Sequence, residues 1–89
     1  MRIEFDPVKD KENLAKHGVS LAMAAHLDWD SALAWVDARF EYNELRMVAL
    51  APKTGVLYYV AFVERGKALR IISLRRALRR EVKRYVEAL

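Results

Sequence analysis

The sequence predicts a small α+β domain in which an N-terminal strand and two helices precede an antiparallel sheet meander and a C-terminal helix. Three apolar runs separated by short glycine-containing linkers predict the meander, at residues 45–51, 56–63 and 68–74. Helix-capping signals occur early in the chain, and apolar residues recur at helical spacing near its end. The 89 residues suit one domain, so residues 1–89 are expected to fold as a single unit.

The first strand is expected at residues 1–5, where polar and apolar side chains alternate. Asp6 followed by Pro7 is typical of a helix N-cap and first helical residue. This helix should run to about His17 and end at Gly18, because glycine readily takes the left-handed conformation found after helices.

A second helix is expected over residues 21–27, with Ser20 as its cap and His26 packed in the core. The pattern in residues 28–43 is weaker, although residues 31–36 could form a strand.

The linkers of the meander, residues 52–55 and 64–67, have four residues each and contain glycine, as hairpin turns do. The last strand should alternate, so that one face carries Leu69, Ile71 and Ser73 and the other carries Arg70, Ile72 and Leu74. A final helix is expected from Arg76. Its apolar stripe should pack onto the core, the sheet or a partner, and consists of Leu78, Val82, Tyr85, Val86 and Leu89.

Basic residues concentrate toward the C-terminus. The net charge is +4, and nine basic residues lie between Arg65 and Arg84 with Glu81 as the single acid among them. Seven of the nine are arginine, whose planar guanidinium suits phosphate. This asymmetry favours a polyanionic partner over a merely solvated helix face.

Several classes of function are excluded by what the chain lacks. It has no cysteine, so disulfides and thiolate chemistry are excluded and a reducing cytoplasm is expected. No apolar run is long enough to span a membrane, and the first residues do not resemble a signal peptide, so a cytoplasmic protein is expected. His17 and His26 have no metal-site spacing and there is no glycine-rich phosphate loop, so neither a metal nor a cofactor is expected.

RNA cleavage requires little machinery, because the 2′-hydroxyl of RNA can itself attack the adjacent phosphate. The enzyme must remove the hydroxyl proton, stabilise the phosphorane and protonate the leaving oxygen. Arg46, Arg70 and Arg75 on adjoining strands could stabilise the phosphorane, and histidine, glutamate or a lysine of lowered pKa could transfer the protons. On these grounds alone, RNA cleavage and simple RNA binding both stay open.

Each candidate also has a structural explanation. Arg70 could be a solvated strand residue, while Glu64 and Arg65 would be ordinary polar residues of a hairpin turn. His17 could serve only the helix dipole, and Tyr85 falls on the apolar stripe. For Trp29 and Trp35, stacking on bases is one interpretation and packing in the core is the commoner one in so small a domain.

Two groups of residues resemble the signatures of the BrnT toxins. The N-terminal group is Asp6-Pro7-x-Lys9 followed by Asn13-x-x-Lys16-His17-Gly18-Val19-Ser20. The C-terminal group is Glu64-Arg65-Gly66, Arg70-Ile71-Ile72-Ser73-x-Arg75-x-Ala77 and Glu81-x-x-x-Tyr85. The two groups lie in the expected order and span most of the chain, and their combination is more specific than either alone.

The resemblance implies a small RelE-like fold and an endoribonuclease toxin of a type II toxin–antitoxin system that inhibits translation. It also implies a cognate BrnA-like antitoxin of the ribbon-helix-helix type, bound in a hetero-oligomer. The positions carried over as catalytic are His17, Glu64, Arg65, Arg70 and Arg75. Lys16, Arg46 and Tyr85 are lesser candidates from the same resemblance. RNA binding is expected from Lys16, Arg46, Arg76, Arg79 and Arg80.

The chain departs from the family pattern at Phe5, at Leu21-Ala22 and at Leu74, which indicates altered packing rather than lost chemistry. The alternative function is a non-catalytic basic nucleic-acid-binding module, or a degenerate toxin that survives as the partner of its repressor. Only the enzyme needs an acid–base pair.

Overall fold

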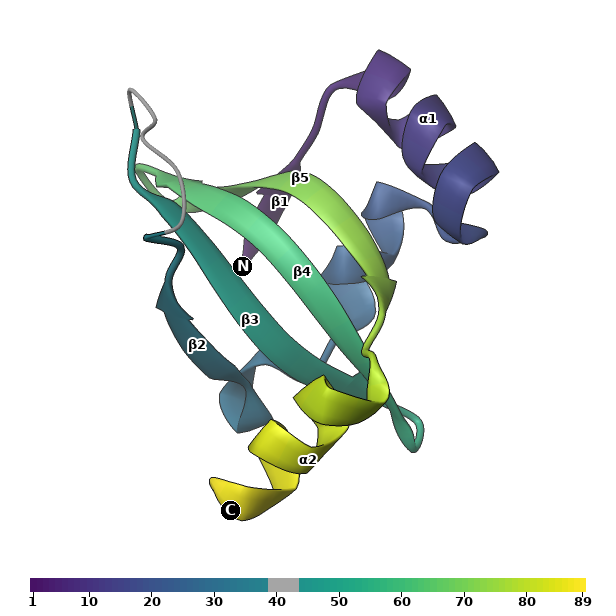
Figure 1. The fold of residues 1–89 in the computed structure, drawn as a ribbon. Coiled ribbons are helices and arrows are strands. Elements are labelled where there is room, and N and C mark those ends of the chain that lie inside the picture. The colour runs from purple at the N-terminus through teal and green to yellow at the C-terminus, as the bar shows by residue number, and fades with distance from the viewer. Residues whose placement is uncertain (39–43) are drawn as a thin grey trace.

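A computed structural model describes residues 1–38 and 44–89, which form a five-stranded sheet with helices on both sides (Figure 1). The elements in chain order are β1 (Arg2–Glu4), α1 (Pro7–His17), the 3₁₀ helices η1 (Leu21–His26) and η2 (Trp29–Ser31), β2 (Leu33–Val36), β3 (Arg46–Lys53), β4 (Val56–Arg65), β5 (Ala68–Arg76) and α2 (Arg79–Glu87). The α+β class is confirmed, as is the antiparallel meander of β3, β4 and β5. Strand β1 pairs in parallel with β5, so the sheet as a whole is mixed.

The hairpin turns are shorter than the sequence predicts. Two residues, Thr54 and Gly55, connect β3 to β4, and both have positive φ, at 49° and 79°. Two-residue turns of this kind match the right-handed twist of the strands they join. The second turn is likewise confined to Gly66 and Lys67, so the prediction that placed Glu64 and Arg65 in a turn is wrong and both residues lie in β4.

Strand β5 contains an irregularity that reverses its alternation. Ile71 is paired with Phe62, but the next pair joins Ser73 to Ala61, which leaves Ile72 as an extra residue. Consequently Ile71 and Leu74 are both buried in the same core cluster, and the predicted opposition of these two side chains is wrong. Beyond the bulge, Arg75 faces the side opposite to Leu74.

Helix η1 covers the core face of the sheet, on the far side in Figure 1. Leu21, Ala24 and Leu27 are buried against it, and this spacing of three residues matches the three residues per turn of a 3₁₀ helix. Ser20 caps the segment as predicted, with its hydroxyl accepting from the Ala22 N–H at 3.1 Å. His26 is exposed, so the expectation that it packs in the core is wrong.

Asn13 joins helix α1 to the sheet and is the one buried polar residue of the described chain. Its amide donates to the carbonyl oxygens of Val19 and Leu74, at 2.9 and 2.8 Å, and its oxygen accepts from the Leu74 N–H at 3.1 Å. The backbone next to the β5 bulge is therefore paired with a side chain of α1. The helix itself begins after Asp6 and ends before Gly18, as predicted.

Helix α2 begins later than predicted, because β5 continues to pair with β4 up to Arg76. The Ala77 N–H then donates to the Leu57 carbonyl at 2.9 Å, and Leu78 precedes the first helical turn. The apolar stripe of α2 does not enter the core: Val82 is 40% and Val86 57% exposed. Tyr85 is half-buried, and its hydroxyl donates to the Ser31 carbonyl at 2.6 Å. Within the described residues, no helix is long and apolar enough to cross a membrane.

Replacing Asn13 with alanine should lower the free energy of unfolding by about 2–3 kcal/mol, because three hydrogen bonds are lost and the Leu74 N–H and C=O are left buried without them. Urea denaturation followed by circular dichroism measures this loss. Leu14→Ala is the control, since Leu14 is exposed on the same helix and its truncation should cost less than about 0.5 kcal/mol. Equal losses in the two variants would contradict the anchoring role of Asn13.

Candidate active site

The face of the sheet opposite η1, which we call the open face, carries several of the arginines singled out in the sequence. Alternation along the strands places Arg46, Val63 and Arg70 in one row across β3, β4 and β5. Further along the same face, Tyr59 pairs with Arg75, close to the point where α2 crosses the sheet (Figure 1). Arg76 points to the other face, because it follows Arg75 in the strand.

Arg75 is held between the sheet and α2. Its two terminal nitrogens donate to the two carboxylate oxygens of Glu81, at 2.8 and 2.9 Å, and one of them also donates to the Arg76 carbonyl at 3.1 Å. The guanidinium lies 4.1 Å from the centre of the Tyr59 ring. Side-chain exposure is 24% for Arg75 and 13% for Glu81, so this pair is better shielded from water than a surface ion pair.

Glu81 carries its negative charge at neutral pH. Burial alone would raise the pKa of its carboxyl, but hydrogen bonds from Arg75 and from the Leu78 N–H, together with the charges of Arg75 and Arg80, outweigh burial and lower the pKa below 4.5. The Leu78 bond, 2.7 Å long, also closes the first turn of α2. One carboxylate therefore sets both the start of the helix and the direction of the Arg75 guanidinium.

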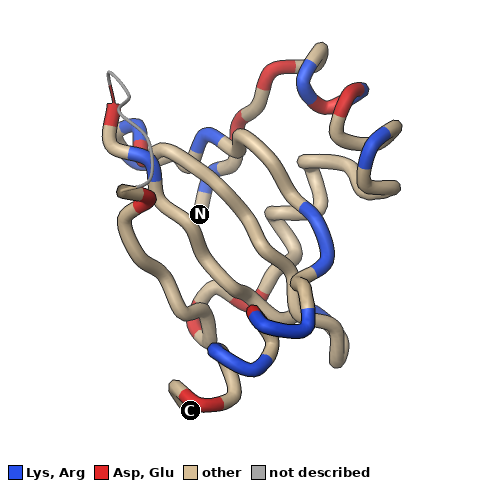
Figure 2. Tube along the Cα trace, viewed as in Figure 1, with Lys and Arg blue, Asp and Glu red and all other residues tan. Residues whose placement is uncertain are grey.

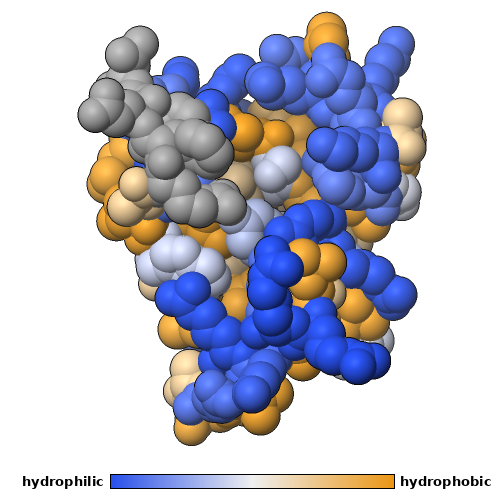
Figure 3. Space-filling model, in the orientation of Figure 1, coloured by the Kyte–Doolittle hydropathy of each residue, from blue (hydrophilic) through white to orange (hydrophobic). Residues whose placement is uncertain are grey.

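A cavity of about 210 Å³ opens next to this pair. Trp35, Val48 and Tyr59 line it from the sheet, and α2 contributes Arg80, Glu81 and Arg84. The Arg84 guanidinium lies 3.8 Å from the centre of the Trp35 ring. In the space-filling view, hydrophilic side chains crowd over α2 and the adjoining end of the sheet, with apolar surface between them (Figure 3).

His17 lies close enough to Arg75 for their charges to interact. Burial, and then the positive charges of Lys16 and Arg75, lower the pKa of the imidazole below 6.5, so His17 is neutral at pH 7. With Lys16 it lines a cavity of about 150 Å³ between α1 and the bulged part of β5, where Ile72 and Ser73 form the other wall. The end of α1 thus brings a neutral base to the cationic end of the sheet.

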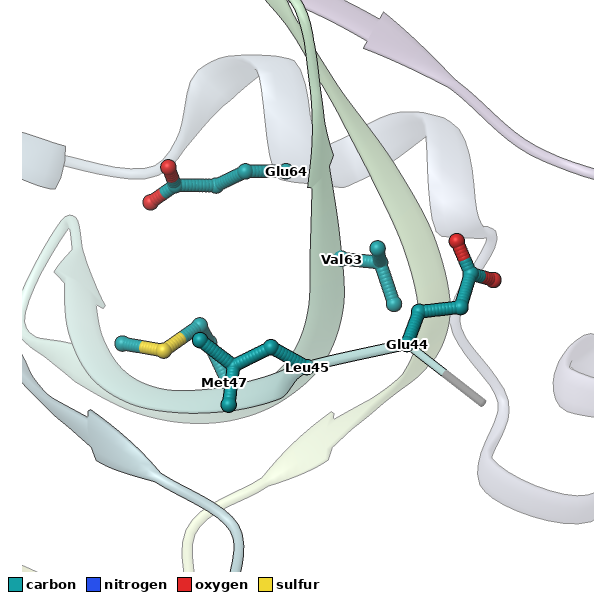
Figure 4. Close-up of a pocket in the computed structure, with 5 residues that line it drawn as sticks. All are labelled: Glu44, Leu45, Met47, Val63 and Glu64. Atoms are coloured by element: carbon teal, nitrogen blue, oxygen red, sulfur yellow. The ribbon is translucent and has the colours of Figure 1, made fainter. Parts of the chain in front are cut away.

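Glu64 and Arg65 lie at the far end of β4. Arg65 donates to Glu44 at 2.8 Å. Glu64 follows Val63, so it points to the face opposite Arg70, and it lines a different cavity of about 310 Å³ with Leu45 and Met47. The carboxylates of Glu44 and Glu64 point away from each other there (Figure 4).

The structure therefore divides the residues singled out in the sequence into two groups. One group lies around the last part of β5, a region that we call the junction: Lys16 and His17 line the cavity toward α1, Arg75 and Arg80 line the separate cavity toward α2, and Arg79 begins α2. Basic residues follow one another from the end of β5 into α2 (Figure 2). Arg46 and Arg70 share the open face but lie nearer its opposite end, where Arg70 is 4.0 Å from Glu4. Arg65 lies beyond them at the end of β4, with Glu64 on the reverse face.

Four residues that line the junction were not singled out as site residues by sequence reasoning: Trp35, Tyr59, Glu81 and Arg84. The motif Glu81-x-x-x-Tyr85 could have pointed to Glu81. The possibility that Trp35 stacks on a base could have pointed to Trp35. Among the described residues, no three histidine, aspartate or glutamate side chains gather as a metal site would require.

The family model of the ribonuclease toxin BrnT, of type II toxin–antitoxin systems, matches residues 5–81. The chain belongs to the BrnT family. BrnT proteins are ribonuclease toxins, so this chain has RNA as its substrate and an antitoxin as its partner. A comparison with curated protein sequences gives no match. The matched BrnT region includes His17, Arg75 and Glu81, and it ends within the first turn of α2.

Replacing Glu81 with glutamine should lower the free energy of unfolding by about 1–2 kcal/mol at pH 7, because the pair with Arg75 is lost. The pKa of Glu81 is lower in the folded than in the unfolded chain, so its stabilisation is present above pH 4.5 and is lost as the pH falls through the folded value. The difference between the two proteins should therefore shrink in urea titrations below pH 4.5. Glu87→Gln is the control on the same helix, because Glu87 is exposed and its ion pair with Lys83 is long, with 3.9 Å between Oε1 and Nζ. A difference that persists unchanged at low pH would contradict the ionic origin of the effect.

Proposed function

We propose that this chain is a metal-independent endoribonuclease that inhibits translation and is neutralised by a ribbon-helix-helix antitoxin. The observation that carries the catalytic part is the position of Arg75: its guanidinium is fixed by Glu81 and Tyr59, and its charge reaches the neutral His17. Cleavage by the RNA 2′-hydroxyl requires a base and a group that stabilises the phosphorane, and His17 and Arg75 would supply them from the two cavities along the last part of β5.

In this mechanism His17 and Arg75 have separate roles. Neutral His17 accepts the proton of the 2′-hydroxyl as its oxygen attacks the adjacent phosphorus. Arg75 stabilises the extra negative charge of the phosphorane, and its guanidinium does not need to reorganise because it is already held. The 5′-oxygen leaves with a proton from solvent, and the upstream fragment keeps a 2′,3′-cyclic phosphate.

The RNA backbone is bound by the surrounding cations. The Arg75–Glu81 pair has no net charge, so the positive potential at the junction comes from exposed side chains, mainly Arg79, Arg80 and Arg84. Arg70 and Arg46 extend this potential along the open face of the sheet. We assign proton transfer to His17 rather than Glu64, because Glu64 lies at the far end of β4 and points to the face opposite Arg75, whereas the charge of Arg75 reaches His17.

Purified chain should cleave single-stranded RNA in excess chelator, because the nucleophile belongs to the RNA and the charge is stabilised by arginine. The upstream fragments should carry a 2′,3′-cyclic phosphate, which mass spectrometry identifies. Substrates with a 2′-deoxynucleotide at the cleaved position should resist cleavage there. Loss of activity in chelator with recovery on addition of a divalent ion would contradict the mechanism, and RNA binding without cleavage would favour the non-catalytic module.

Arg75→Ala should reduce the cleavage rate on the order of 10²-fold, the usual effect of removing one group that stabilises transition-state charge. Arg75→Lys keeps the charge but not the bidentate pair with Glu81, and should recover only part of the rate.

Arg70→Ala tests the other end of the open face and should weaken RNA binding more than it lowers the rate at saturating RNA. Lys67→Ala, in the exposed β4–β5 turn, is the control and should be unchanged. Single-turnover kinetics below the melting temperature of each variant separate these effects, and a full rate in Arg75→Ala would exclude Arg75.

The surface of α2 suits the antitoxin. Its apolar side chains are exposed and adjoin the basic residues that we assign to RNA, so a partner that covers the helix would bury both. The exposed apolar residues are Leu78, Val82, Val86 and Leu89. An acidic antitoxin would complement the charge and block access to Arg75 at the same time.

The double substitution Val82→Asp and Val86→Asp should raise the Kd for the product of the adjacent antitoxin gene by at least about 30-fold. Two apolar side chains that the antitoxin would bury become charged. Isothermal titration measures the affinity, and RNA cleavage should be retained. Val8→Asp is the control, since Val8 is also an exposed valine, at 63%, but lies on α1. Expression of the double variant with the antitoxin should arrest growth, whereas the Val8 variant should be neutralised. Full affinity in the double variant would place the antitoxin elsewhere.

A further inference from the structure

The two tryptophans of the chain lie in different environments. Trp29 belongs to the core: its indole N–H donates to the Ala24 carbonyl at 2.8 Å, and its ring meets Phe62 edge to face at 5.3 Å. Trp35 lies on the opposite face, on the edge strand β2, where it is half-buried and lines the cavity beside Arg75. Packing of the η1 core therefore accounts for Trp29 and does not account for Trp35.

The cavity has two aromatic walls. Trp35 pairs with Val48 across β2 and β3, and Tyr59 pairs with Leu50 across β3 and β4, so the two rings occupy adjacent rows of the same sheet face. Val48, which is 1% exposed, lies between them in the lining. At about 210 Å³ the space is below the roughly 300–1,000 Å³ of pockets that enclose drug-sized ligands, and it suits a single flat ring system.

We propose that this cavity binds one nucleobase of single-stranded RNA, stacked on Trp35, next to the phosphate that Arg75 contacts. The proposal rests on the proposed ribonuclease function, because it uses the same approach of the RNA strand. Duplex RNA does not fit it, since paired and stacked bases are not available to a side chain in this position.

The arginines over the two rings agree with this assignment. A guanidinium and a nucleobase are both planar groups that stack on an aromatic face, and Arg84 now occupies the face of Trp35 at 3.8 Å. The contact of an exposed arginine with a ring is weaker than the stacking of a base on it. An incoming base therefore displaces Arg84, which is an exposed residue of α2 and can then pair with the RNA phosphate.

Stacking would give the site affinity for a base without base-specific hydrogen bonds. Glu81 is the one carboxylate in the lining, and its oxygens already accept three hydrogen bonds, from Arg75 twice and from the Leu78 N–H. The remaining polar groups in the lining are mainly donors on arginines. Every base has a face that can stack, so the cavity should accept different bases.

The test uses 2′-deoxytetranucleotides, which should bind the same surface as RNA but cannot be cleaved because they lack the 2′-hydroxyl. Four deoxyadenosines are compared with an abasic tetramer that has the same phosphates and no bases. The base-bearing tetramer should bind roughly tenfold more tightly than the abasic one, the contribution expected of one stacked base. In Trp35→Ala the two tetramers should bind equally, while the affinity for the abasic tetramer stays unchanged.

Intrinsic fluorescence identifies the ring involved, because the chain has two tryptophans. The base-bearing tetramer should quench the emission of Trp29→Phe, which retains Trp35, and should not quench Trp35→Phe, which retains the core residue. If Trp29→Phe does not fold, the wild-type protein against Trp35→Phe makes the same comparison. Equal binding of the two tetramers by the wild type, or quenching that persists in Trp35→Phe, would overturn the base site. Neither readout depends on cleavage, so the base site and the ribonuclease mechanism can fail separately.

Discussion

The extra residue at Ile72 is the constraint on which the site depends. Without it, the strict alternation of β5 would send Leu74 away from the η1 core and turn Arg75 toward it. With it, Ile71 and Leu74 both fill the core and Arg75 emerges on the open face beside Tyr59. The bulge disturbs the ladder locally, and the backbone of Leu74 is satisfied instead by Asn13 from α1. One irregularity thus fixes the core, the helix that packs beside it and the orientation of the arginine.

Arg75 illustrates how a small domain can hold a charged group in place. An exposed arginine loses conformational entropy when it binds a phosphate, and that loss weakens the interaction. Here Glu81, the Arg76 carbonyl and the Tyr59 ring restrict the guanidinium before any ligand arrives. The cost is that the Glu81 carboxylate cancels the charge of Arg75 locally. The exposed arginines of α2 restore the positive potential that attracts a polyanion.

Helix α2 joins the candidate site to the surface that we propose for the antitoxin. It has nine residues, too few to be stable by itself in water, so its position depends on contacts with the rest of the chain. Three of these contacts are polar or cation–π: Glu81 with Arg75, Arg84 with the Trp35 ring, and Tyr85 with the Ser31 carbonyl. The apolar side chains remain on the outside. A protein that binds this apolar surface therefore sits next to the arginines at the junction, which is a simple way to silence a ribonuclease toxin.

The sequence by itself determined what short-range physics controls. The α+β class, the caps of α1, the meander and the basic C-terminal end follow from residue periodicity, turn chemistry and charge, and the paired motifs indicated the BrnT family. The two-residue turns, the delayed start of α2 and the 3₁₀ form of η1 were not predicted, because strand pairing and packing override local preference at the ends of elements. Which residues come together at the candidate site was decided only by tertiary structure. Glu64 and Arg65 adjoin each other in the sequence yet lie away from His17, while Trp35, Tyr59 and Glu81 converge from three separate elements. A bulge of one residue changes the face of every side chain after it, and periodicity read from the sequence alone does not reveal where the chain takes that extra step.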